Sequence, residues 1–325
     1  MAIIIPANSA ADTAYSVDNS CRFNDGDTAH LKRTFGSEGD RTEWTFSCWI
    51  KRGILGTQQQ IFGSGNNATH LYFESNDTLK LGLETSSGDK VIQTNRVFRD
   101  CSAWYHIVAN YDSNEATTGN RMRIYVNGVE ETSFSTETQP SSGESTATIS
   151  DNVEHNIGYR TVTSAGLPFD GYMAEVVFVD GTAYAASDFG EFDEDSPTVW
   201  KPKDVSELTF GTNGAYLDFE DSGNLGDDHS TNTNDWAENN IAATDQATDT
   251  PTNNFCTLNP LDHNNVTFTE GNLKGSCGSS GTCRSTMAVN KGKWYWEFKY
   301  IDPEGFHGIR AVSYTHLTLP TNREV

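Results

Sequence analysis

Two segments near the middle of the chain alternate apolar and polar residues with a period of two. They are WYHIVANYDSN, from Trp104 to Asn114, and RMRIYVNGVEETSF, from Arg121 to Phe134. This period is typical of a β-strand with one buried face. Asn127-Gly128 interrupts the second segment, and Asn-Gly between two strand patterns favours a type I′ turn, in which both central residues need φ > 0. We therefore predict a hairpin of a β-sandwich here, which favours surface binding over catalysis.

Shorter strand patterns recur on both sides of this hairpin, separated by clusters of Gly, Ser, Asn and Asp. No apolar stripe with helical spacing lasts for three turns, so helices are not expected as major elements. Short strands with this spacing predict an all-β fold, a sandwich or jelly roll. The clearest patterns are Trp44–Ile50, His70–Phe73, Leu79–Leu83, Asn156–Tyr159 and Tyr172–Val179.

The pattern becomes irregular after residue 188. Residues 220–254 are mostly Asp, Asn, Thr and Ser, with few large apolar side chains. Such a segment buries too little apolar surface to offset its ordering entropy, so it is either an extended connector or held against its neighbours. Strand patterns return at Val266–Phe268 and are strongest over Lys293–Ile301. A second β domain is predicted to begin there.

The last residues of the chain affect how the chain is divided into domains. Val312–Thr321 (VSYTHLTLPT) resembles the in-frame translation of a sequencing-library adapter, so we expect residues 312–325 to be an artefact tail. A second sandwich cut after its first strands has unpaired edges, so we expect the natural protein to be longer. The predicted parts are an N-terminal arm (1–13), a sandwich (14–188), a polar extended connector (189–262), a truncated second sandwich (263–311) and the tail (312–325).

Charge excludes some partners. The 325 residues include 22 basic and 45 acidic side chains, giving a formal net charge of −23. A surface this acidic repels phosphate backbones and anionic lipid, so we expect no nucleic-acid partner. No run approaches the roughly 18 apolar residues that a membrane span requires, so we expect no membrane insertion. Ile3–Ile5 before Pro6 is too short for the core of a signal peptide, which predicts synthesis in a cytoplasm.

Three parts of the chain together resemble the laminin-G-like branch of the concanavalin-A-like sandwich superfamily. They are SCRFNDGDTAHL with TEWTFSCWIKR (Ser20–Leu31 and Thr42–Arg52), WYHIVANYD with RIYVNGVE (Trp104–Asp112 and Arg123–Glu130), and FDGYMAEVVFVDG (Phe169–Gly181). The order and spacing of these parts match as well as their composition. The resemblance implies a laminin-G-like jelly-roll sandwich over residues 14–188.

Two further resemblances concern the second half. KGKWYWEFKY (Lys291–Tyr300) is similar to the opening strand of a SPRY domain, a sandwich of related architecture. Asp235–Asp262 is similar to the segment that joins these two domains in virion structural proteins of tailed bacteriophages, notably marine ones. The resemblance implies a fibre-associated virion appendage protein, located in the virion, with other virion proteins as partners.

Laminin-G-like and concanavalin-A-like sandwiches include glycan binders, which often use calcium. Calcium needs several oxygen ligands that converge from loops. Asp112, which follows a predicted strand, and Asp170, which precedes Gly171, are therefore candidate calcium ligands. The alternative is that both belong to the many acidic loops that are merely solvated.

The same superfamily includes glycoside hydrolases, whose alternate carboxylates along one strand face the substrate. Glu191–Asp195 (EFDED) comes close to that pattern, but Gly190 precedes it and Ser196-Pro197 follows, so we interpret it as an acidic loop. We expect no catalytic and no cofactor-binding residues. The predicted function is a non-enzymatic virion component that contacts cell-surface glycans through its loops. The alternatives are a polysaccharide depolymerase on the same fold and a bacterial surface adhesin.

Overall fold

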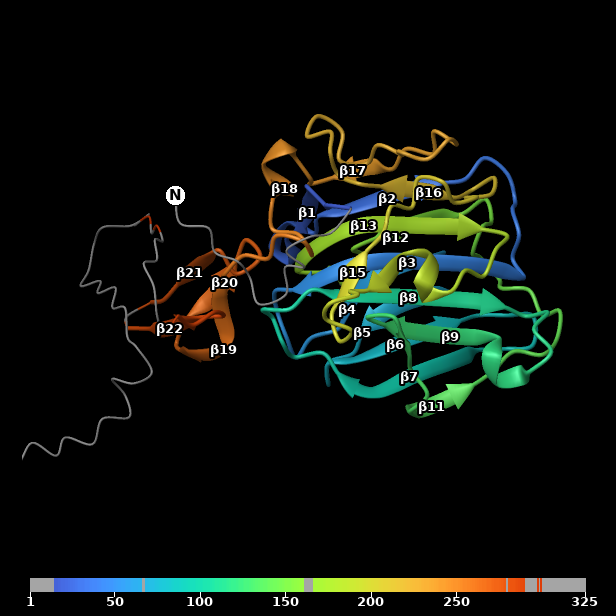
Figure 1. Ribbon diagram of the computed structural model, residues 1–325, viewed down its shortest axis with the longest axis horizontal. Helices are drawn as coiled ribbons and strands as arrows, with labels where there is room; N and C mark the ends of the chain where they lie inside the picture. The colour runs from blue at the N-terminus through green and yellow to red at the C-terminus, as the bar shows by residue number, and fades with distance from the viewer. Residues whose placement is uncertain are drawn as a thin grey trace, which may run out of the picture.

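The computed structural model describes residues 15–65, 68–160, 166–278 and 280–289, together with residues 297 and 299. Two eight-stranded antiparallel sheets face one another and form a sandwich (Figure 1). Helical structure in the described residues is limited to short 3-10 turns in loops. These are Asp25–Asp27, Thr118–Asn120, Ala186–Asp188 and Ala243–Asp245. The all-β fold predicted from the sequence is confirmed, and no described helix is long and apolar enough to cross a membrane.

The first sheet, called sheet A, has the strand order β10-β9-β8-β3-β13-β1-β18, and β16 also pairs with β13. Its long central strands are β3 and β13, which pair along their whole length around a β-bulge between Ala174 and Val177. The strands are β1 (Ser20–Phe23), β3 (Glu43–Arg52), β8 (Tyr105–Asp112), β9 (Met122–Val126), β10 (Val129–Glu130), β13 (Gly171–Asp180), β16 (Ala215–Leu217) and β18 (Gln246–Ala247).

The second sheet, called sheet B, has the order β11-β7-β6-β5-β4-β12-β2-β17. Strands distant in the sequence lie side by side in it, because β12 pairs with both β2 and β4. The strands are β2 (His30–Thr34), β4 (Gln59–Ser64), β5 (Thr69–Phe73), β6 (Thr78–Leu83), β7 (Lys90–Val97), β11 (Phe134–Thr138), β12 (Glu154–Ile157) and β17 (Ala237–Asn239).

The hairpin predicted from Asn127-Gly128 joins β9 to β10. Both turn residues have positive φ, 49° and 78°, as a type I′ turn requires. The prediction that this hairpin buries one face is wrong. Ile124 and Val126 lie in the core between the sheets, whereas Tyr125, only 8% exposed, packs in a second apolar cluster on the outer face of sheet A.

The core between the sheets is rich in aromatic residues. Phe46 of sheet A stacks on Phe62 of sheet B with ring centroids 4.4 Å apart, and Phe178 lies 5.4 Å from the same ring. Alternation along each strand directs these side chains inward and their neighbours outward. The outward-facing side chains determine whether the outer face of each sheet is apolar or polar.

The outer face of sheet A is covered by residues 182–210, which we call the covering segment. It includes the short strands β14 (Gly190–Phe192) and β15 (Trp200–Pro202), and β15 lies in front of sheet A in Figure 1. Phe189, Val205 and Phe210 of this segment pack on Val108, Val177 and Val179 of the sheet. Burial of apolar side chains at about 25 cal/mol per Å² makes this a second core.

Residues 189–262, treated above as a polar connector, supply strands to both sheets. β16 and β18 join sheet A and β17 joins sheet B. The buried Lys51 ammonium donates to Asp249 Oδ2 at 2.7 Å, to Asn254 Oδ1 at 2.8 Å and to Phe255 O at 2.6 Å. Of the two arrangements left open for residues 220–254, the structure shows the segment held against the sandwich, by polar contacts that hydrophobic periodicity does not reveal.

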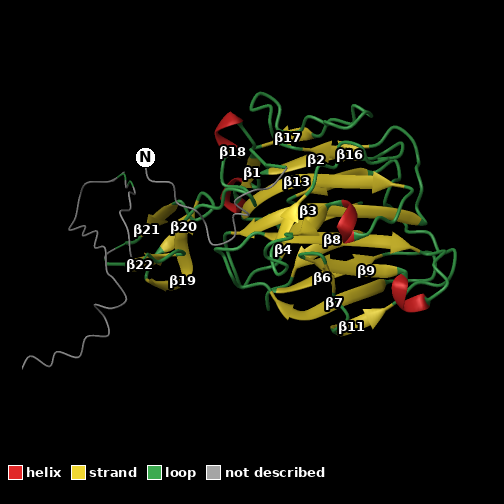
Figure 2. Cartoon of the chain, in the orientation of Figure 1, coloured by secondary structure: helices red, strands yellow, loops and turns green. Residues whose placement is uncertain are grey.

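Two two-stranded sheets follow and lie beside one end of the sandwich (Figure 2). β19 (Leu258–Asn264) pairs with β22 (Thr282–Ser285), and between them β20 (Thr267–Thr269) and β21 (Lys274–Ser276) form a hairpin. Asn272 Nδ2, between β20 and β21, donates to Gly53 O at 2.7 Å and attaches this hairpin to the sandwich. The arm at 1–13, the tail at 312–325 and the SPRY-like segment Lys291–Tyr300 lie outside the described residues, apart from Glu297 and Lys299.

Candidate functional site

The outer face of sheet B carries polar side chains where sheet A carries apolar ones. Cross-strand pairs define a row of outward positions, because residues opposite one another share a face. Thr34 lies opposite Glu154, and Asn156 lies opposite both Lys32 and Gly63. The residues between them, such as Leu31 and Ile157, point into the core. Strands β2, β12 and β4 therefore present one continuous polar surface.

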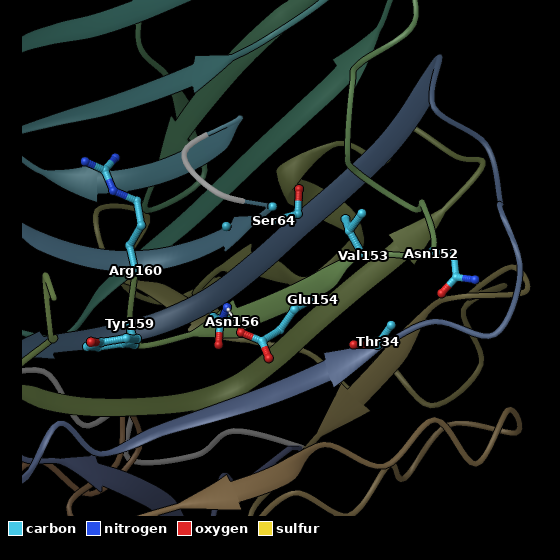
Figure 3. Close-up of a pocket in the computed structure, with 10 residues that line it drawn as sticks. Thr34, Ser64, Asn152, Val153, Glu154, Asn156, Tyr159 and Arg160 are labelled. Atoms are coloured by element: carbon cyan, nitrogen blue, oxygen red, sulfur yellow. Dashed lines mark hydrogen bonds between the residues drawn. The ribbon is translucent and has the colours of Figure 1, made fainter. Parts of the chain in front are cut away.

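A cavity of about 350 Å³ lies on this surface (Figure 3). Tyr159 and Arg160 lie at one end, Glu154 and Asn156 near the middle, and Asn152 at the other end. Gly63 also lines the cavity, and a Cβ there would lie 2.6 Å from Thr69 O, so no larger residue fits. A second cavity of about 280 Å³ adjoins the first, sharing Thr34 and Glu154 and adding Lys32, Arg33 and Asp235.

Two polar residues in the middle of the cavity are incompletely satisfied. Asn156 is 8% exposed and its Nδ2 donates to Glu154 Oε1 at 3.2 Å, while its buried Oδ1 accepts no hydrogen bond from the described residues. Besides this hydrogen bond, the Glu154 carboxylate has a long ion pair, 4.0 Å from Lys32, with the two side chains 49% and 41% exposed. A buried acceptor without a donor costs free energy, which a ligand hydroxyl can recover.

The end of the cavity is built around aromatic rings. Tyr159 stacks on His30 with ring centroids 4.7 Å apart and also packs against Gly166. The Arg160 guanidinium lies over the Tyr72 ring, 5.3 Å from its centroid. Tyr72 in turn donates its hydroxyl to Glu74 at 2.8 Å, and Lys80 donates to the same carboxylate oxygen at 3.2 Å. These contacts fix the wall of the cavity before any ligand arrives.

Comparison with known proteins agrees with this fold. Residues 25–187 match the model of the concanavalin A-like lectin/glucanases superfamily, in its laminin G form, over half of the chain. The chain belongs to this superfamily. No curated protein matches it. This match confirms the laminin-G-like sandwich that the sequence resemblance implies, and we call the chain concanavalin-A-like below.

Solved structures support the same fold. A protein from Bacteroides ovatus, provisionally assigned carbohydrate binding, matches with a TM-score of 0.50 and 16% identity, over 72% of this chain and 60% of its own. A heptameric pentraxin from Limulus polyphemus matches with a TM-score of 0.39 and 20% identity, over 53% and 80%. Mouse laminin α1 domains LG4-5 match with a TM-score of 0.39 and 13% identity, over 64% and 50%. Of these three, only the Bacteroides ovatus match bears on the fold, and at 16% identity it establishes the fold alone.

The two candidate calcium ligands of this concanavalin-A-like chain lie at opposite ends of β3. Asp112 lies opposite Glu43, the first residue of β3, and Gly171, next to Asp170, lies opposite Arg52, the last. Ten residues of strand at about 3.3 Å each place the two carboxylates roughly 30 Å apart, so one cation cannot bind both. Neither lines a cavity described above.

Asp170 is the better fit for a cation. It is buried beside Asp25, and burial first, then the Asp25 charge, raises the pKa of Asp170 to about 7. Two carboxylates in contact suit either a shared proton or a cation. Asp112 instead accepts the Asn114 N–H at 2.9 Å and closes a turn. Because no cluster of three His, Cys, Asp or Glu suited to a metal occurs in the described part of the chain, calcium at either residue stays a prediction.

A buried Ser–His pair, which the sequence analysis did not find, lies under the covering segment. Ser47 Oγ is 2.9 Å from His106 Nε2, and the Trp200 indole N–H donates to His106 Nδ1 at 3.0 Å. Nδ1 is thus the acceptor, so the proton is on Nε2 and donates to Ser47. Burial lowers the pKa of His106 to about 3. A histidine in this tautomer cannot take the serine proton, so the serine is not activated.

Glu191–Asp195 is not arranged as a catalytic strand either. Glu191 lies in the short strand β14, and Lys201 lies 3.3 Å from Glu191 and 3.6 Å from Asp193. Asp193 Oδ1 also accepts the N–H groups of Asp195 and Ser196 and so holds its own loop. The interpretation as an acidic loop agrees with these contacts, and none of these residues lines the two cavities described above.

Proposed function

We propose that this protein is a non-enzymatic glycan-binding protein that holds sugar on the outer face of sheet B. The observation that carries this proposal is the cavity of about 350 Å³ over β2, β4 and β12, with its unsatisfied buried Asn156 Oδ1. The volume lies at the small end of ligand sites in proteins. The provisional assignment of carbohydrate binding to the Bacteroides ovatus protein also supports glycan binding by this chain.

The residues suit a molecule rich in hydroxyl groups. The Glu154 carboxylate accepts hydrogen bonds from sugar hydroxyls, and Asn156 Oδ1 adds a second acceptor beside it. Tyr159 supplies an apolar wall that is already ordered by His30 and Gly166. Because Glu154 and Asn156 are held in the paired strand β12 and Tyr159 is held by its ring contacts, little conformational entropy is lost on binding.

The absence of catalysis is part of the proposal. The unactivated Ser47 and the ion-paired Glu191 and Asp193 support it, because neither group offers a nucleophile or a general acid in a cavity. We further place the protein in the appendage of a phage virion, where glycan binding would attach the particle to its host. The similarity of Asp235–Asp262 to phage virion proteins supports this location, and neighbouring capsid and tail genes would separate it from a bacterial surface adhesin.

A glycan array with matched variants tests the binding site. Glu154→Gln changes a half-exposed glutamate that faces Lys32, and Glu191→Gln changes a glutamate 51% exposed that faces Lys201 on the covering segment. We expect E154Q to weaken glycan binding about tenfold or more, since a charge-assisted hydrogen bond is lost, while E191Q binds like the wild type. Equal binding by both variants would contradict the site.

The array should be read with calcium and with a chelator. Binding that is lost in chelator and restored by calcium in the wild type, but is absent in Asp170→Asn under both conditions, would show that the sugar site depends on a cation near Asp170. Silence of the wild-type protein across all glycans under both conditions would leave a scaffold role in place of glycan binding.

A depolymerase is the second candidate, because two carboxylates line the adjoining cavity of about 280 Å³, Glu154 and Asp235. Glycoside hydrolysis needs two carboxyl groups roughly 5–9 Å apart. Against it, the Glu154 carboxylate already has two partners, the Lys32 ammonium at 4.0 Å and Asn156 Nδ2 at 3.2 Å. Incubation with each glycan bound on the array should release no new reducing ends. Release that stops in both Glu154→Gln and Asp235→Asn would establish the enzyme.

A further inference from the structure

The charge at the end of the cavity is unusual for this chain. Arg160 is half-buried, and its Nε is buried without an acceptor among the described residues. Its guanidinium contacts the Tyr72 ring but has no carboxylate within ion-pair distance in the described part of the chain. Burial lowers the pKa of Arg160, and the nearby Tyr72 and Glu74 only partly offset this effect.

The neighbouring Lys80 has the carboxylate partner that Arg160 does not have among the described residues. Lys80 lies over the same Tyr72 ring at 5.5 Å, and its ammonium pairs with Glu74 at 3.2 Å. Acidic side chains outnumber basic ones by 45 to 22, so partners are abundant. A half-buried arginine that lines a cavity and still has no ion pair can take an anion from outside the protein.

The rest of the cavity limits what that anion can be. Glu154 lies in the middle of the same cavity and repels a ligand that is anionic along its whole length. Asn156 Oδ1 beside it needs a hydroxyl donor. A molecule with hydroxyl groups at one end and a single anionic group at the other satisfies both ends.

From this arrangement we infer that the ligand is an acidic sugar, whose carboxylate or sulfate binds Arg160 while its hydroxyls face Glu154 and Asn156. The inference rests on the glycan-binding function proposed above and narrows it to one class. The two donors of the guanidinium fork match the two oxygens of a carboxylate or sulfate. Tyr72 holds that fork in place from behind.

A set of paired oligosaccharides tests this inference on the full chain. Each neutral glycan is measured beside the same glycan with one sugar oxidised to a uronic acid and with one sugar carrying a sulfate ester. The wild type should bind one or both acidic forms about tenfold or more tightly than the neutral form. The two acidic arms show whether carboxylate or sulfate is preferred.

Three variants separate recognition from folding. Arg160→Gln should remove the preference for the acidic form, while its affinity for the neutral form stays within about twofold. Arg160→Lys keeps the charge without the fork and should keep a weaker preference. Lys201→Gln changes a cation of the covering segment that is paired with Glu191 and lines neither cavity, and it should keep the full preference.

The outcomes distinguish this inference from the proposed function. Equal wild-type affinity for acidic and neutral forms overturns the acidic-sugar inference and leaves glycan binding intact. An Arg160→Gln variant that loses both forms equally also overturns it, since the arginine would then only support the wall. No binding to any glycan overturns both.

Discussion

The two sheets of the sandwich have the same alternating geometry, yet their outer faces differ. On sheet A the outward residues Val108, Val177 and Val179 are apolar and lie under the covering segment. On sheet B the outward residues Lys32, Glu154 and Asn156 are polar and line open cavities. Covering an apolar face contributes to stability, whereas an open polar face contributes little. The comparison indicates that sheet A holds the fold together and that sheet B is available for binding.

Polar groups follow the same division. On the outer face of sheet A, Lys51 and Glu175 are buried and hydrogen-bonded. Lys51 has three acceptors, and Glu175 Oε2 accepts the hydroxyls of Tyr15 and Tyr216 at 2.8 Å each. On the outer face of sheet B, Asn156 Oδ1 and Arg160 Nε have no hydrogen-bond partner among the described residues. Satisfied buried groups specify structure, and unsatisfied ones at a cavity indicate a ligand.

The largest expected effect comes from breaking the buried ion pair on sheet A. Asp249→Ala leaves Lys51 buried and unpaired and removes the acceptor of the Trp104 indole N–H. We expect a loss of about 3–5 kcal/mol in the free energy of unfolding, measured in urea. Asp235→Ala, on the outer face of sheet B, is the control and should cost about 1 kcal/mol or less. Similar costs at both positions would remove the distinction between the faces.

The second effect depends on pH. Glu175 lies at the bulge of β13 beneath the cover, and burial raises its pKa to about 7 despite two tyrosine hydrogen bonds. An acid with a raised folded pKa binds its proton more tightly when folded, so stability falls as pH rises from the unfolded value near 4.5 through 7.

Glu175→Gln should remove this dependence. Relative to wild type, the variant should gain about 2–3 kcal/mol of unfolding free energy between pH 5 and pH 8. Urea unfolding at the two pH values measures the change. Because Asp170 also has a raised pKa and acts in the same direction, only the difference between variant and wild type isolates Glu175. A constant difference at both pH values would show that Glu175 is not buried in the folded state.

The smallest stability effect is expected on sheet B. Asn110 of sheet A is buried and donates to Tyr184 O at 2.9 Å, and Asn156 of sheet B is buried with an unsatisfied Oδ1. We expect Asn110→Ala to cost about 1–3 kcal/mol and to leave glycan binding unchanged. Asn156→Ala should cost about 1 kcal/mol or less and abolish glycan binding. Thermal unfolding together with the array checks both, and the reverse order of stabilities would contradict the assignment of the two faces.

The sequence predicts the strands well because their information is local. The strand expected within Trp104–Asp112 and the Asn127-Gly128 turn both appear in the structure, although both faces of that strand are buried. Tyr125 shows the limit of this reasoning. Its polar hydroxyl suggests a solvent-facing position, but the cover that buries it comes from residues more than fifty positions away.

The candidate site is harder to predict for the same reason. Its residues come from β2, β4 and β12, which become neighbours only through long-range pairing. Asp112 and Asp170 were chosen because they follow or precede strands, and the structure places them away from the cavities. The alternation of Glu154 and Asn156 within a strand pattern is the one local signal, and it shows a polar face without showing a cavity.

Amide hydrogen exchange with the tightest-binding glycan of the array tests the central claim most directly. Binding on the outer face of sheet B should slow exchange in β4, β12 and β2 and leave the covering segment, residues 182–210, unchanged. Slowed exchange confined to the covering segment, or to the loops around Asp112 and Asp170, would place the ligand elsewhere and contradict the account.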